Sequence, residues 1–189
     1  MRREYNIKHI FLVIAACVVL FSPIYILLMP NIVADTIYYD RNSWLTYVPS
    51  INYWVLGISV FTFALCFVLL GLLKSWKISI PTALIAFALS VVTFYYASLS
   101  YISLNEDQIS YRKMFSTEKE IYQWEELNKV SYYMVDEKSE ELPYYSFYFN
   151  NGEKFTIKEN THVLDVASSI RWRVKAAEVP IEHVETWNE

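Results

Sequence analysis

The chain has 189 residues, of which 54% are hydrophobic, and carries 16 Lys and Arg against 20 Asp and Glu. Residues 1–104 hold six bases and three acids, whereas residues 105–189 hold ten bases and seventeen acids, a net charge of −7. Nucleic-acid binding rests on clustered Lys and Arg that neutralise phosphates, so this acidic half argues against a nucleic-acid partner. Cys17 and Cys66 lie in apolar runs and offer neither a disulfide framework nor a metal-ligand spacing.

Three uncharged runs are long enough to cross a membrane, because about 20 apolar residues in a helix span the hydrocarbon core. The sequence therefore predicts transmembrane helices at about residues 10–29, 55–73 and 81–102. A cleaved signal peptide is the competing interpretation of the first run, which exceeds the usual length of about 7 to 15 apolar residues. Residues 30–53 are rich in Tyr and Trp and are expected to form a loop along the headgroups, where amphipathic aromatic side chains concentrate.

Small residues recur on one side of the second and third predicted helices. They are Gly57, Ala64 and Gly71 in the second, and Thr82, Ala86, Ser90, Thr93 and Ala97 in the third. Helices in lipid associate where small residues allow close approach, so we expect these two faces to meet. The interiors of the spans hold no acidic or basic residue, although transporters need ionisable groups at that depth. The helices are therefore interpreted as a scaffold.

The distribution of cations predicts the orientation of the chain. If each run crosses once, one side of the membrane carries Arg2, Arg3, Lys8, Lys74 and Lys77. The loop on the opposite side carries only Arg41. The positive-inside rule then places the N-terminus in the cytoplasm and, after three crossings, the C-terminal domain outside it.

After residue 104 the pattern changes to short alternating segments, which are typical of half-buried strands. Strands are predicted at residues 108–113, 120–124, 129–135, 144–149 and 154–158, with a tight turn at Asn150–Gly152. An amphipathic helix capped by Thr161 follows and stops before Pro180. The expected domains are a membrane domain over residues 1–103, a β domain over 104–178 and an acidic tail over 179–189. In that tail Ile181, Val184 and Trp187 are expected to dock on the sheet edge.

The candidate core of the β domain is a set of large apolar and aromatic residues at inward-facing positions. They are Ile109, Tyr111, Ile121, Trp124, Val130, Phe147, Phe155, Leu164 and Ile170. Trp124 and Ile121 are interpreted as core anchors and not as ligand contacts.

The order of strands followed by one helix, together with Ile109-Ser110-Tyr111 and the segment Ile121–Val130, resembles bacterial pleckstrin-homology-like (PH-like) domains attached to membrane helices. In the second segment a strand, a Trp, an acidic turn and a Lys-Val strand follow one another. The resemblance covers about residues 103–176. It implies that the three predicted transmembrane helices are followed by a small antiparallel sheet of the split-barrel type with a C-terminal amphipathic helix, which makes the whole chain an α+β fold. It implies a fold more than an activity.

The first hairpin of the β domain departs from lipid-binding relatives of this family. Its cations Arg112, Lys113 and Lys119 are offset by Glu118 and Glu120, so a phosphoinositide site is not expected.

The sequence contains no recognisable catalytic or nucleotide-binding motif and only three glycines. The three histidines, His9, His162 and His183, stand far apart, with no nucleophile or paired acid at a recognisable spacing. We therefore expect no enzyme activity, no cofactor, no metal and no small-molecule substrate.

Three functional hypotheses follow for a protein of the bacterial plasma membrane. The first is a non-enzymatic multi-pass protein whose β domain binds a partner protein or organises a complex at the membrane surface. The second is a bacteriocin or toxin immunity protein. The third is a small transporter or a subunit of an enzyme complex.

Overall fold

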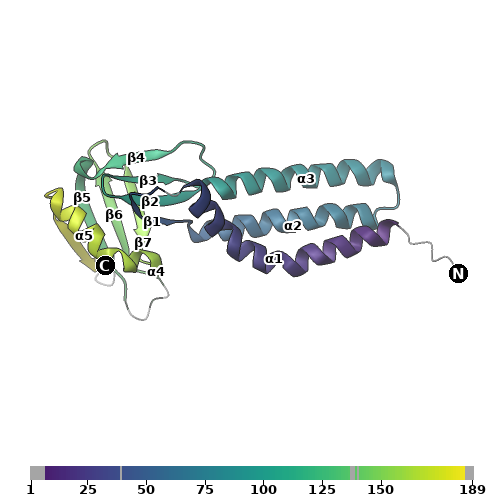
Figure 1. Cartoon of the computed structure of the whole chain (residues 1–189), viewed down its shortest axis with the longest axis horizontal. Coiled ribbons are helices and arrows are strands. Elements are labelled where there is room, and N and C mark those ends of the chain that lie inside the picture. The colour runs from purple at the N-terminus through teal and green to yellow at the C-terminus, as the bar shows by residue number, and fades with distance from the viewer. Residues whose placement is uncertain (1–6, 39, 137–138, 140, 186–189) are drawn as a thin grey trace. The chain divides into compact units, whose positions relative to one another are not determined.

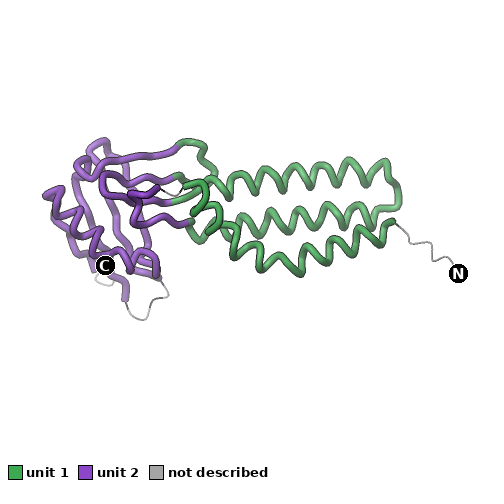
Figure 2. The backbone as a smooth tube through the Cα atoms, viewed as in Figure 1, with its two compact units in different colours: residues 1–38, 48–101, 112–118 green, residues 39–47, 102–111, 119–189 purple. Residues whose placement is uncertain are grey.

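A computed structural model describes residues 7–38, 40–136, 139 and 141–185 (Figure 1). The chain forms two compact units that interleave along the sequence. Unit 1 comprises residues 1–38, 48–101 and 112–118, and unit 2 comprises residues 39–47, 102–111 and 119–189 (Figure 2). Unit 1 is mainly helical and also includes Tyr101, Arg112 and the turn at residues 113–118. Unit 2 contains the rest of the β-strands.

Unit 1 is built on three long apolar helices, α1 (Ile7–Ile37), α2 (Ser50–Leu72) and α3 (Trp76–Leu99). Each is long and apolar enough to cross a membrane. At 1.5 Å per residue they measure about 46, 34 and 36 Å, against a hydrocarbon core of about 30 Å. The chain thus has the three membrane-spanning candidates expected of a multi-pass protein, and α1 is longer than a crossing requires.

The interpretation of residues 30–53 as a loop is wrong. Helix α1 continues to Ile37 through Pro23 and Pro30, and its axis changes direction along its length (Figure 1). A strand, β1 (Ser43–Tyr47), follows, and α2 begins at Ser50. The third helix also ends earlier than predicted, because Tyr101 and Ile102 already belong to strand β2.

Helix α2 packs against both α1 and α3, which touch each other little. A reciprocal pair of hydrogen bonds joins α2 to α3: Ser59 Oγ donates to the Ser90 carbonyl, and Ser90 Oγ donates to the Ser59 carbonyl, both at 2.9 Å. Both serines are buried. Small hydroxyl residues therefore allow these two backbones to approach closely and also satisfy their own polar groups.

The two glycines of α2 face α1 and not α3, which differs from the expected pairing of small-residue faces. A Cβ placed on Gly71 would lie 2.7 Å from the Leu12 side chain and 3.0 Å from the Lys8 carbonyl oxygen. A Cβ on Gly57 would lie 3.8 Å from Ile26, an ordinary contact. On α3, Ala86 is buried towards α2, whereas the Thr82 hydroxyl bonds its own helix at Ile78.

Gly71→Ala is expected to destabilise the helical unit by about 1 to 3 kcal/mol, the usual cost of overpacking. The added methyl group would push α1 away from α2. The matched control is Gly57→Ala, which should be neutral or stabilising by up to about 1 kcal/mol, since Ala favours a helix over Gly. Denaturation of the full chain in mixed SDS micelles, followed by circular dichroism, measures both. Equal effects of the two changes would contradict the close α1–α2 contact at Gly71.

Side chains cap the ends of two helices in unit 1. Asn52, which is fully buried, donates through Nδ2 to the carbonyls of Ala97 (2.7 Å) and Ser100 (2.9 Å) at the end of α3. The Tyr38 hydroxyl donates to the adjacent Ser98 carbonyl at 2.8 Å. At the end of α2, Lys8 Nζ donates to the Leu73 carbonyl at 2.7 Å. These donors satisfy carbonyls that a helix end leaves without intrahelical partners.

Unit 2 contains two four-stranded sheets. The first has the order β1-β2-β3-β4, with β2 (Tyr101–Asn105), β3 (Gln108–Arg112) and β4 (Glu120–Gln123). The second has the order β7-β6-β5-β8, with β5 (Leu127–Met134), β6 (Tyr144–Phe149), β7 (Lys154–Lys158) and β8 (Ile181–Glu185). The described strands pair antiparallel except β8, which runs parallel to β5, and they form no closed barrel.

The C-terminal helix is broken into α4 (Thr161–Asp165) and α5 (Ala167–Ala176) at Val166. Its N-cap is Asn160, whose side chain accepts a hydrogen bond from Val163 N at 3.0 Å, and not Thr161 as predicted. Residues 181–185 of the expected tail add a strand to the edge of β5, while Trp187 lies outside the described residues.

Seven of the nine candidate core residues belong to one buried cluster: Ile109, Tyr111, Trp124, Val130, Phe147, Phe155 and Ile170. Ile121 and Leu164 were assigned to the core wrongly, because their side chains are 48% and 56% exposed. In β4 the alternation of side chains turns Tyr122 inward, and in α4 Val163 occupies the inward position. Each assignment was one residue out of phase.

Candidate docking groove

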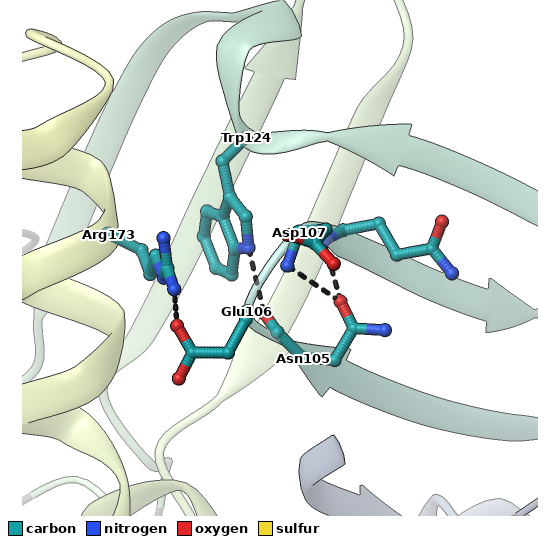
Figure 3. A network of polar contacts seen from close by, with 6 residues as sticks. Asn105, Glu106, Asp107, Trp124 and Arg173 are labelled. Atoms are coloured by element: carbon teal, nitrogen blue, oxygen red, sulfur yellow. Dashed lines mark hydrogen bonds and ion pairs between the residues drawn. The ribbon is translucent and has the colours of Figure 1, made fainter. Parts of the chain in front are cut away.

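Trp124 organises the polar contacts beneath the candidate site (Figure 3). It is 2% exposed and begins a short 3₁₀ turn (Trp124–Glu126) after β4. Its indole Nε1 donates to the carbonyl of Asn105 at 3.0 Å. The Asn105 side-chain oxygen accepts from the backbone N–H groups of Asp107 (2.9 Å) and Gln108 (2.7 Å). These bonds fix the β2–β3 turn in one conformation.

The same turn is tied to α5 by an ion pair. Glu106, at the turn, pairs with Arg173 of α5 (Figure 3). The Glu106 side chain is 58% exposed, whereas that of Arg173 is 22% exposed. The Arg173 guanidinium also lies over the Trp172 ring, 4.5 Å from its centroid. Arg173 is therefore held by a carboxylate and an aromatic face, while the carboxylate remains accessible to solvent.

A surface hollow of about 360 Å³ lies at this junction of β1, the β2–β3 turn and α5. Its lining residues are Trp44, Glu106, Ser168, Ser169, Trp172 and Arg173, which together we call the docking groove. Trp44 lies over Trp124 with 6.2 Å between ring centroids, so the buried indole supports one wall. Trp172 is 60% exposed. Trp and Arg are enriched at protein interfaces, where a few such residues dominate the binding energy.

Trp124 lies in the core, as the sequence predicted, and supports the groove from there, whereas the residues that line the groove were not predicted. Trp44 fell in the segment interpreted as a headgroup loop. Trp172 lies between Arg171 and Arg173 on the polar face of a helix, and an exposed Trp at such a position was the signal that could have indicated the site.

A second polar cluster in unit 2 has a structural explanation. Glu159 is only 7% exposed and accepts a hydrogen bond from the Tyr132 hydroxyl at 2.5 Å. Arg171 Nε donates to the Tyr145 hydroxyl at 3.4 Å. Burial, with the neighbouring Glu159 carboxylate, raises the pKa of Tyr132, so its hydroxyl stays protonated and available as a donor. The cluster joins β5, β6, α5 and the residue after β7, and the buried carboxylate is satisfied without a ligand.

The helices of unit 1 enclose a larger apolar cleft of about 400 Å³. Its lining is aromatic and aliphatic apart from Ser22, Ser59, Ser90 and the hydroxyl group of Tyr25. Ser59 and Ser90 are already bonded to each other's carbonyls. Since the residues lining it include no Asp, Glu, Lys, Arg or His, the cleft lacks the ionisable groups that couple transport, and a lipid chain suits it better than a polar substrate.

The remaining ionisable candidates do not converge. Among the described residues, no three His, Cys, Asp or Glu side chains are grouped so that they could hold a metal ion. His162 stacks on Tyr47 at 5.7 Å, and His183 meets the edge of Tyr132 at 5.6 Å. Neither a protein-family model nor a curated protein matches the chain. The docking groove, by contrast, brings two Trp side chains, an Arg and an exposed carboxylate together.

Proposed function

We propose that this chain is a non-enzymatic, multi-pass protein of the bacterial membrane whose β domain docks a partner polypeptide in the groove at Trp172. One observation carries the proposal: an exposed Trp and an accessible carboxylate are presented together on a scaffold fixed by Trp124 and the Glu106–Arg173 ion pair. Side chains held in place before binding lose little conformational entropy, which favours affinity.

We also propose that the β domain is of the PH-like split-barrel type. The order of its elements supports this assignment: a sheet ending with β4, a second sheet beginning with β5, and a helix, α5, after the last hairpin. The segment Ile121–Val130, which carries the sequence resemblance, connects the last strand of the first sheet, β4, to the first strand of the second sheet, β5.

The partner segment would combine an apolar side chain with a basic one. The apolar side chain packs on Trp172, and the basic one meets the exposed carboxylate of Glu106. The net charge of −7 on residues 105–189 attracts such a segment and speeds its encounter with the domain.

Photo-cross-linking in cells tests this function. A photoreactive residue replaces Ser168, an exposed residue lining the groove, in the full chain. We expect a discrete polypeptide adduct that weakens at least about tenfold when Trp172→Ala is added, since interface anchors contribute roughly 2 kcal/mol or more. The matched control carries the photoreactive residue at Thr156, an exposed position on β7. Equal adducts at both positions, or an adduct indifferent to Trp172→Ala, would refute docking at the groove.

We further propose that the N-terminus is cytoplasmic and the β domain extracytoplasmic. Lys8, Lys74 and Lys77 share one side under this topology, in agreement with the positive-inside rule. The pairing of β1 with β2 supports two crossings between them, because it requires both strands on the same side. A thiol reagent that cannot cross membranes should label Ser139→Cys in intact cells. Labelling only after the cells are lysed would indicate that the β domain lies in the cytoplasm and would contradict this orientation.

A further inference from the structure

In the turn between β3 and β4, one position has a backbone conformation that is unfavourable for the large residue occupying it. Ser116 N donates to the Lys113 carbonyl at 3.1 Å, which closes a turn over residues 113–116. Phe115, the third residue of that turn, has φ 64°, in the left-handed region. Gly or Asn occupies such a position readily, whereas a large side chain is strained there. The conformation of the turn therefore does not explain why a Phe occupies this position.

Packing within the protein does not explain Phe115 either. Its side chain is 63% exposed and makes a ring contact with Tyr96 of α3, with centroids 5.7 Å apart. The preceding residue, Met114, packs against a small cluster that includes Val55 and Ala97. The turn is thus fixed to the helices by Met114, while most of the Phe115 ring faces away from protein.

The helix residues that this turn touches lie at the depth of the lipid interface. Helix α3 has 24 residues, or about 36 Å, and exceeds the hydrocarbon core by only about 6 Å in total. Tyr96 and Ala97 lie within the last turn of α3, so they come close to the boundary of that core. Tyr95, beside them, is 53% exposed, as expected of an aromatic residue among the headgroups.

We propose that Phe115 inserts its ring at the boundary between lipid headgroups and acyl chains, and so anchors the β3–β4 turn to the bilayer. The partner of the exposed Phe115 ring is then the lipid interface. This ring contacts Tyr96 at the aromatic end of α3, which lies at the same interface. Insertion depends on the apolar ring and not on headgroup charge, because Lys113 and Lys119 are offset by Glu118 and Glu120. One ring alone anchors weakly, but the adjoining membrane helices keep it at the surface.

Depth-dependent fluorescence quenching of the full chain in lipid vesicles tests this proposal. Cys17 and Cys66 are replaced by Ala, and an environment-sensitive fluorophore is attached at Thr117→Cys, an exposed position beside the turn. Val92→Cys, an exposed position on α3 about 10 Å along the helix from its end at Leu99, provides the deeper standard. A nitroxide on the headgroup should quench the label at position 117 more than one deep in the acyl chain, and the opposite order should hold at position 92.

The decisive variant is Phe115→Asn, because Asn accepts the positive φ and keeps the turn. We expect the equilibrium ratio of molecules with the turn inserted to those with the turn withdrawn to fall at least about tenfold, the scale expected for burying one Phe ring. Quenching by the headgroup nitroxide should then be lost at position 117, while quenching of the standard at position 92 should not change. Headgroup quenching that survives Phe115→Asn would overturn the proposal. So would a label shielded from water-soluble quenchers yet unaffected by either nitroxide, because that result indicates a protein contact instead.

Discussion

Trp124→Ala is expected to destabilise unit 2 by about 3 to 5 kcal/mol, the usual cost of truncating a buried aromatic residue. The change also removes the donor to the Asn105 carbonyl and the support beneath Trp44. Unit 2 comprises about 90 residues. A domain of that size has a total stability of roughly 4 to 14 kcal/mol. The loss is therefore a large share of the whole and would leave the domain marginal.

Near-ultraviolet circular dichroism of the detergent-solubilised full chain during heating measures this loss. Trp172→Ala is the matched control, because it removes an exposed Trp from the same unit and should change stability by no more than about 1 kcal/mol, the scale of its exposed contact with Arg173. A Trp124→Ala protein that melted at the temperature of the control would contradict the role given to this side chain.

Asn52→Ala is expected to lower the stability of the helical unit by about 2 to 6 kcal/mol. It leaves the buried carbonyls of Ala97 and Ser100 without their side-chain donor, at about 1 to 3 kcal/mol for each unsatisfied group. The end of α3 should fray as a result. Hydrogen exchange over residues 94–100 of the full chain in micelles reports this directly, with faster exchange expected in the variant.

The control for Asn52 is Asn31→Ala. Asn31 is exposed on α1, where its side-chain nitrogen lies 3.5 Å from the Leu27 carbonyl oxygen and its side-chain oxygen accepts a hydrogen bond from the Tyr53 hydroxyl. The Asn31→Ala substitution should have little effect on hydrogen exchange at the end of α3. If both variants exchanged at the same rate as the unchanged chain, Asn52 would not be the cap that its geometry indicates.

Features that depend on neighbouring residues could be predicted from the sequence. The bounds predicted for β6 and β7 match the structure, because the turn between them contains Gly152, which adopts the positive φ of 85°. The three apolar helices were also evident, since bilayer thickness sets their minimum length. In both cases the information lies within about twenty residues of chain.

Pairings between distant segments could not be predicted in this way. Strand β1 pairs with β2 across the whole α2–α3 hairpin, and β8 pairs with β5 from the far end of the domain. Nothing in Ser43–Tyr47 specifies that partner. The docking groove was missed for the same reason: Trp44, Glu106 and Trp172 come from three segments that meet only after these pairings form.

The position of β1 has a consequence for biosynthesis. Its partner β2 is made only after the 54 residues that separate Tyr47 from Ile102. A ribosome adding roughly 5 to 20 residues per second needs about 3 to 11 s for this stretch. During that time Ser43–Tyr47 is a strand edge without a partner, the form in which polypeptides most readily pair with other chains. Translational pauses within α3 would prolong this period, so the yield of correctly folded protein should depend on codon usage there.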